Sequence, residues 1–371
     1  MALSQSAETR RAVGRIQRLC CLGLGGQRLM PALMSAVNQL VPASNRQFYW
    51  ADLRMEIANC YIEGPGLDYL SLYLSEFSGG RREREVRLTF PEMMRTRFPS
   101  AAGDVFERFF KVDWNTFVRS DYYNLLRRPC GIEKGVLFKV VAAGRPIGAF
   151  HFFRSVGEPA FTPQDFALLE GLHGFIAHSL IDGPGEDGYA DTEDRALVIL
   201  DRRGLLLHMS PEAHRLLLMA LVPQWASETA IRMRLDNPPE LAQLCQTLSA
   251  ASSACLRSTP PVVRRNNAWG EFVLRAYWLD ASRSEESSRF IGVTIERREP
   301  RSLSLWRKVE ALPLSQREKQ VCLMLARGHD AANVARAMGV SEHTVISHRR
   351  SLYSKLGVEN RLALIGRLRL G

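Results

Sequence analysis

The sequence has no long hydrophobic run. Its longest unbroken apolar stretch extends from Leu216 to Val222 and stops at Pro223, whereas a helix that spans a bilayer needs about 18 or more such residues. The stretch from Met1 to Arg15 carries scattered charges and no apolar segment, so we expect no signal peptide. A cytoplasmic protein without a membrane partner is therefore expected.

The cysteines follow no ligand pattern. No two of the seven cysteines stand in C-x-x-C spacing and their number is odd, which excludes the usual zinc motif and a complete disulfide framework. We expect reduced, buried thiols, as in a reducing compartment, and neither a metal nor another cofactor. The seven are Cys20, Cys21, Cys60, Cys130, Cys245, Cys255 and Cys322.

Signatures of common enzymes are missing as well. The chain has no phosphate-binding G-x-x-x-x-G-K-[ST] loop, no H-E-x-x-H zinc site and no G-x-S-x-G nucleophile turn. His151 and His208 lie in strand patterns, where we expect a satisfied core or surface histidine rather than a ligand. His173 and His178 are five residues apart, which places them on different faces of a helix. We therefore expect no enzymatic activity.

The sequence does have a basic C-terminal end. The chain of 371 residues is 46% hydrophobic and 24% charged, which is typical of a globular protein with two or three domains. Residues 301–371 carry 13 Lys and Arg against five Asp and Glu, and so hold +8 of the net charge of +10. Such an end binds polyanions, although charge alone does not separate nucleic acid from an acidic membrane.

Loop-like stretches divide the chain into three blocks. The run 182–188 contains only glycine, proline and acidic residues, and a softer boundary lies near Pro300. We expect an α+β chain whose parts are a first domain over 6–181, a second over 190–298, a linker helix over 299–312 and an all-α domain over 313–371.

The first block combines predicted strands with a capped terminal helix. Aromatic and β-branched residues predict strands over 46–52 and 55–62 and a hairpin over 136–153, and Thr162 before Pro163 predicts a helix start. This order resembles a GAF domain, most closely where Arg145-Pro146-Ile147-Gly148-Ala149 leads towards Phe161-Thr162-Pro163-Gln164-Asp165. The resemblance implies a small-molecule sensor or a dimerisation module.

A helical and loop-like insert lies between these strands. Residues 67–128 are rich in aromatic side chains, for which we expect core packing, with the lining of a ligand pocket as the alternative. Within the insert, the charged run Arg81-Arg82-Glu83-Arg84-Glu85 predicts an exposed loop.

The second block alternates strands and turns. Strand patterns over 196–200 and 205–209 flank the turn Asp201-Arg202-Arg203-Gly204, and Ser210 predicts a helix N-cap. A second hairpin is predicted over 270–295. This order resembles a PAS fold, which implies a domain that holds a ligand or transmits a change to the next domain.

Four short helices with clear end signals are predicted in the third block. Ser315 and Glu318 have the spacing of a capping box. Two of the helices, joined through Gly339, describe a helix-turn-helix. The expected N-caps and glycine stops are Ser315, Asp330, Ser341 and Asn360 and Gly328, Gly339 and Gly357.

The third of these helices has two contrasting faces. On a helical wheel Val345, Leu352 and Leu356 fall on one side, and polar and basic residues fall on the other. Arg350 is the best candidate for reading a base, because a guanidinium pairs bidentately with guanine, and Ile346 suits a thymine methyl group. The expected DNA-contacting residues are His343, Thr344, Ile346, Ser347, His348, Arg350 and Lys355, of which Thr344, His348 and Lys355 suit phosphates.

Three runs in this block carry a family pattern: Leu314-Ser315-x-Arg317-Glu318-x-x-Val321, Val340-Ser341-x-x-Thr344-Val345-x-x-His348 and Lys355-Leu356-x-Val358. They resemble the LuxR-type DNA-binding domain. The resemblance implies that the third helix reads the major groove and that the fourth supports dimerisation. Two positions depart from the pattern: Ile346 stands where a basic residue is usual, and Ala331-Ala332-Asn333 replaces the common Asn-x-Glu.

These features predict a sequence-specific transcription regulator that binds double-stranded DNA as a homodimer. A signal sensed in the first two domains, such as a small-molecule effector, would control it, and RNA polymerase is a further candidate partner. Two alternatives stay open. In the first, the chain is a signalling adaptor that binds polymerase or another regulator and has only weak DNA contact. In the second, its first two domains bind nothing and only dimerise.

Overall fold

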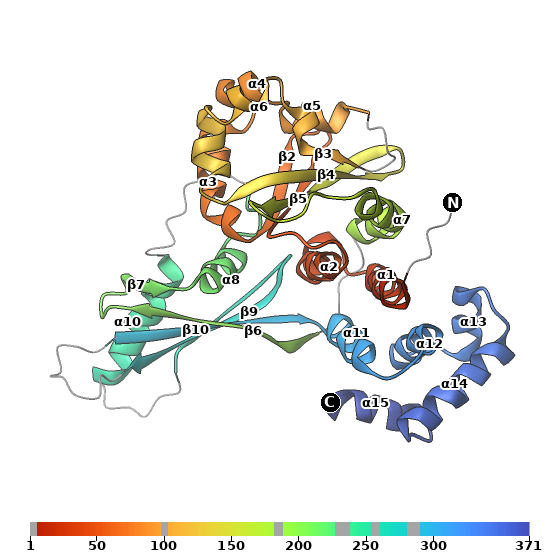
Figure 1. The fold of residues 1–371 in the computed structure, drawn as a ribbon. Helices are drawn as coiled ribbons and strands as arrows, with labels where there is room; N and C mark the ends of the chain where they lie inside the picture. Colours follow the sequence, from red (N-terminus) through yellow and green to blue (C-terminus); the bar gives the residue numbers. More distant parts are fainter. Residues whose placement is uncertain are drawn as a thin grey trace. The chain divides into compact units, whose positions relative to one another are not determined.

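The computed structural model describes residues 6–97, 103–181, 188–226, 238–253, 260–279 and 290–370. Within these ranges the chain is an α+β protein with two five-stranded sheets and a C-terminal group of helices (Figure 1). The expected fold class is confirmed. No helix in the described ranges is long and apolar enough to cross a bilayer.

The first sheet has the strand order β2-β1-β5-β4-β3, and each neighbouring pair is antiparallel. The expected hairpin is present as β4 and β5 and is longer than its sequence pattern indicated. Ala143 and Gly144 both have positive φ between these strands, which suits a two-residue hairpin turn. The strands are β1 (Asn45–Ala51), β2 (Ile57–Glu63), β3 (Gly103–Val105), β4 (Ile132–Ala142) and β5 (Arg145–Ser155).

Side chains alternate between the two faces of this sheet. Phe138 and Phe150 are register partners on one face, and Gln47 and His151 are register partners on the other. Helix α7 (Pro163–Leu180) covers the first of these faces, because the ring of its His173 lies 5.9 Å from that of Phe138. The second face is therefore available to the insert.

Helices of the insert lie against that second face, where Phe90 packs 6.5 Å from His151 between ring centroids (Figure 1). The charged run expected as an exposed loop is instead helix α4, and its Glu83 is fully buried. The expected loop is therefore wrong; the other four residues of the run are exposed as expected, and Glu83 is buried because it pairs with the equally buried Arg87. The insert comprises η1 (Pro65–Tyr69), α3 (Leu70–Leu72), η2 (Tyr73–Phe77), α4 (Arg81–Val86), α5 (Phe90–Arg95), η3 (Phe106–Phe109), α6 (Trp114–Phe117) and η4 (Tyr123–Arg127).

The second sheet has the order β7-β6-β10-β9-β8. The expected turn is present: the Asp201 carboxylate accepts from the N–H groups of Arg203 and Leu205 at 2.8 Å each, and Gly204 has φ +85°. Strand β8 and helix α10 have no counterpart among the predicted elements. The elements are β6 (Tyr189–Leu200), β7 (Leu206–Met209), α8 (Pro211–Leu221), α10 (Pro239–Ser253), β8 (Val262–Asn267), β9 (Gly270–Leu279) and β10 (Phe290–Pro300).

The chain groups into two compact units. One comprises Met1–Leu40, Ser179–Ala190 and Glu299–Gly371, and the other comprises Val41–His178 and Asp191–Arg298. The first unit thus places α1 (Ala7–Cys20) and α2 (Gly26–Leu40) with α11 (Arg301–Ala311) and the helices after it. The domain boundaries drawn from the sequence divide the chain differently, and they stay a prediction.

Helix α1 is attached to the C-terminal helices by buried polar contacts. The Arg18 guanidinium donates to both carboxylate oxygens of Glu310 at 2.6 and 2.8 Å, and both side chains are less than a tenth exposed. Arg327 donates to the carbonyl oxygen of Leu22 at 3.2 Å. These contacts join segments about 300 residues apart in the chain.

Candidate nucleic-acid interface

Helices α12 (Gln316–Ala326), α13 (Ala331–Met338), α14 (Glu342–Leu356) and α15 (Arg361–Leu370) form the C-terminal group. The expected capping box begins α12. The Glu318 N–H donates to Ser315 Oγ at 3.3 Å, and the Ser315 N–H donates to the Glu318 carboxylate at 2.7 Å. Two of the unpaired donors at this helix end are satisfied in this way.

The remaining helix ends follow the same local rules. The side chains of Asp330, Ser341 and Asn360 each accept from a backbone N–H three residues further on, at 2.7, 3.2 and 2.9 Å. Gly339 and Gly357 end α13 and α14 in the left-handed conformation, where a side chain would be strained. The short connection from α13 to α14 is therefore a helix-turn-helix, as predicted.

One face of α14 is buried. Val345 and Leu352 are completely shielded and Leu356 is 3% exposed, which confirms the predicted inward stripe. Val321 of α12 and Val334 of α13 are also fully buried, and both helices pack on α14. Burial of each such side chain contributes roughly 1.5–3 kcal/mol, so this stripe fixes the rotation of α14 about its own axis.

The opposite face of α14 is open. His343, Ser347 and Arg350 are exposed, and Thr344, Ile346 and His348 are half-buried. Among the residues that the structure describes, no acidic side chain forms an ion pair with Arg350. His343, Ser347 and Arg350 are thus on the outside as the helical wheel predicts, and the contact of all six residues with DNA stays a prediction.

Lys355 has a partner within the protein. Its Nζ lies 2.7 and 2.8 Å from the two carboxylate oxygens of Glu318, and the Ser351 hydroxyl donates to the same carboxylate at 2.6 Å. Burial raises the pKa of Glu318, but the hydrogen bonds from Lys355, Ser351 and Ser315 outweigh it and bring the pKa to about 2. The Lys355 side chain is 46% exposed, so its ammonium ties α14 to α12 at the edge of the candidate interface.

This contact was not found from the sequence. Glu318 reads as a capping residue and Lys355 as a phosphate ligand, and the two are 37 residues apart. The only local signal is the spacing of Ser351 and Lys355, which places both on one face of α14.

These four helices have recognisable relatives. Residues 312–367 match GerE, the luxR family of bacterial regulatory proteins. Over 56 residues the chain is 43% identical to the transcriptional regulatory protein UhpA of Escherichia coli K12 and, equally, to UhpA of Salmonella typhimurium LT2. The matched segment is 15% of this chain and 29% of each of these relatives, so the chain spans less than a third of their length.

Solved structures overlap more of the chain at lower similarity. SdiA of Escherichia coli overlaps 98% of this chain and 96% of its own, at 13% identity and a TM-score of 0.32. A GAF domain/HD domain protein of Geobacter sulfurreducens overlaps 46% of this chain and 92% of its own, at 14% identity and a TM-score of 0.28. At these scores the overlaps do not establish a shared fold, and the GAF-like and PAS-like assignments stay predictions.

Proposed function

We propose that this protein is a sequence-specific transcription regulator that binds double-stranded DNA through α14. The observation that carries the proposal is the pair of faces on this helix: a buried apolar stripe holds it, and Arg350 stands exposed on the other side. The match of residues 312–367 to the luxR family and the similarity to the transcriptional regulatory protein UhpA support it.

In this proposal the residues of α14 divide by the group they contact. Arg350 donates to the O6 and N7 atoms of a guanine, Ile346 contacts a thymine methyl group, and His343 and Ser347 face neighbouring base edges. Thr344 and His348 contact phosphates at the edge of the groove. Lys355 adds charge near the backbone while its bond to Glu318 holds the angle of α14.

The proposed assembly is a homodimer in the cytoplasm that places one α14 in each half-site of a roughly palindromic operator. Half-sites then lie about one helical turn, or roughly 34–36 Å, apart. A small-molecule signal received in the GAF-like or PAS-like part shifts an equilibrium between two arrangements of the dimer. RNA polymerase is the proposed downstream partner.

Selection of bound sequences from a random DNA pool, followed by titration, tests the proposal. We expect the selected site to bind about 10³-fold or more tighter than random DNA. Arg350→Ala should cost about 1–3 kcal/mol and relax one base position, whereas Arg203→Ala, an exposed arginine in the β6–β7 turn, should leave binding unchanged. A wild type that does not prefer its selected site would favour a signalling adaptor instead, and an unaltered preference in Arg350→Ala would contradict the base contact assigned to Arg350.

A further inference from the structure

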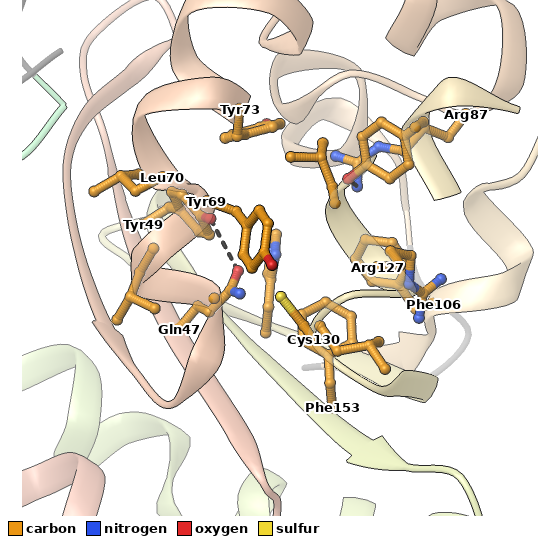
Figure 2. Close-up of a pocket in the computed structure, with 16 residues that line it drawn as sticks. Gln47, Tyr49, Tyr69, Leu70, Tyr73, Arg87, Phe106, Arg127, Cys130 and Phe153 are labelled. Atoms are coloured by element: carbon orange, nitrogen blue, oxygen red, sulfur yellow. Dashed lines mark hydrogen bonds between the residues drawn. The ribbon is translucent and has the colours of Figure 1, made fainter. Parts of the chain in front are cut away.

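A pocket lies between the first sheet and its insert. The space open to the centre of a water-sized sphere measures about 60 Å³, roughly four to six times what one water needs. Figure 2 shows Gln47 and Leu70 on one side of this pocket and Phe106 and Arg127 on the opposite side. The pocket therefore has room for a small organic molecule between mostly apolar and aromatic walls.

Two buried arginines line the pocket, and one of them is neutralised. Arg87 is 2% exposed, and its Nη2 lies 2.9 Å from a carboxylate oxygen of the fully buried Glu83. Its Nη1 donates to the Tyr122 hydroxyl at 2.6 Å. Arg87 and Glu83 thus form a closed ion pair that leaves no charge for a ligand.

Within the described part of the chain, Arg127 has no such counterion. It is 3% exposed, and its Nη2 donates to the Glu133 carbonyl oxygen at a long 3.4 Å. Its Nε and Nη1 have no hydrogen-bond partner among the described residues. Burial lowers its pKa to about 10 despite attraction from Tyr122 and Glu107, so the guanidinium stays charged at neutral pH. A buried charge without a partner is costly, and proteins normally pair such groups.

The guanidinium is held by aromatic rings instead. It lies 5.2 Å from the ring centroids of both Phe106 and Phe153, which also line the pocket. The face of an aromatic ring attracts a cation, but it does not accept hydrogen bonds from the N–H groups that lie in the plane of the guanidinium. The in-plane Nε and Nη1 donors of Arg127 are thus left without an acceptor among the described residues.

His151 adds a third unsatisfied nitrogen to the same pocket. It is 4% exposed and its Nε2 has no partner among the described residues, contrary to the satisfied histidine expected from the sequence. Burial, together with Arg87 and Arg127, holds its pKa well below the usual range, so the imidazole is neutral. The pocket accordingly contains one uncompensated positive charge and one free polar nitrogen.

We propose that this pocket binds a small carboxylate with an aromatic or aliphatic body, and that the carboxylate pairs with Arg127. A planar carboxylate matches the fork of N–H donors on a guanidinium. The apolar walls favour an organic anion, because an inorganic anion has no apolar surface to pack against Leu70 and Phe153. This ligand class deepens the proposed function, because it names the signal that the regulator would sense, and the binding itself does not depend on DNA.

Calorimetric titration of the full chain without DNA tests the inference. The probes are benzoate, phenylacetate and hexanoate, and benzamide serves as the neutral analogue of benzoate. We expect saturable binding of at least one acid, with benzamide at least about tenfold weaker than benzoate if benzoate binds. Arg127→Gln should weaken the acid about 10- to 100-fold, the range of a charge-assisted hydrogen bond.

A matched control is the next residue along the chain. Arg128 is exposed, so Arg128→Gln makes the same chemical change outside the pocket and should bind like wild type. Leu70→Phe keeps both arginines but fills the pocket, and it should abolish binding even if Arg127→Gln fails to fold.

Three results would overturn the inference: no acid binds at millimolar concentration, benzoate binds but benzamide binds equally well, or a folded Arg127→Gln binds the acid like wild type. Failure of the DNA selection with intact acid binding would contradict the proposed function and leave the pocket assignment standing.

Discussion

Replacement of Glu318 by Gln removes the charge that holds α14 on α12 and keeps the shape of the side chain. The carboxylate has a pKa of about 2 in the folded protein against an ordinary 4.5, a difference that corresponds to about 3 kcal/mol. Lys355 is 46% exposed, and solvent screening of its charge reduces the expected loss to about 2 kcal/mol.

The direction of the pKa shift of Glu318 determines how its contribution to stability depends on pH. Because folding lowers this pKa, the carboxylate stabilises the protein at pH values above about 4.5, and the contribution is lost as the pH falls towards 2. Amide hydrogen exchange of the full chain measures the local stability of α12 and α14 separately from the rest of the protein. At pH 7 Glu318→Gln should speed exchange through local opening by roughly 30-fold, the equivalent of 2 kcal/mol.

The difference between wild type and Glu318→Gln should stay constant from pH 7 to about 5 and shrink below 4.5, after correction for intrinsic exchange rates. Glu342→Gln is the matched control, because Glu342 is exposed in the first turn of α14. It should change the free energy of local opening, as measured by exchange, by only a few tenths of a kcal/mol, the size of a helix-dipole effect. Equal exchange in Glu318→Gln and wild type at pH 7, or a difference that is as large at pH 3 as at pH 7, would refute the role assigned to this carboxylate.

Two further substitutions test other contacts of the same unit. Ser341→Ala removes the N-cap of α14 and should cost about 1 kcal/mol, measured as faster exchange in its first turn, whereas Ser354→Ala on the exposed side of the helix should be close to neutral. Arg18→Gln removes the two hydrogen bonds from Arg18 to the buried Glu310 carboxylate, which keeps only Lys319 at 3.5 Å, and should weaken the packing of α1 on α11 by about 2 kcal/mol. Exchange of the α1 amides checks this against the exposed control Arg11→Gln, and unchanged protection of α1 in Arg18→Gln would contradict it.

Helix ends could be predicted from the sequence because their causes are local. The side chains of Ser315, Ser341 and Asn360 each cap an amide three residues away, so the relevant partners are adjacent in the printed chain. The orientation of α14 was accessible for a similar reason, since a helical period places Val345 and Leu352 on one face before any neighbour is known.

Other elements left no local signal. Strand β8 carries Arg264, Arg265 and two asparagines at mostly exposed positions, so it shows no alternation of apolar and polar residues. The attachment of α1 to α11 depends on Arg18 and Glu310, which are 292 residues apart. Neither residue differs in the sequence from an ordinary charge on a helix surface, and only the tertiary fold buries them together.

The charges of the pocket could not be predicted from the local sequence either. Glu83 and Arg87 are four residues apart, and the sequence predicts an exposed loop around Glu83, yet both side chains are buried. Because Glu83 is paired with Arg87, Arg127 forms no ion pair within the described residues and is attracted only through space, mainly by Tyr122 and Glu107, and this imbalance exists only once the insert folds onto the sheet. Charge counts along a sequence cannot reveal it, since the insert also holds acidic residues that stay outside the pocket. A buried cation that the fold leaves unpaired is therefore evidence about a ligand, and its anionic class follows from the sign of the charge.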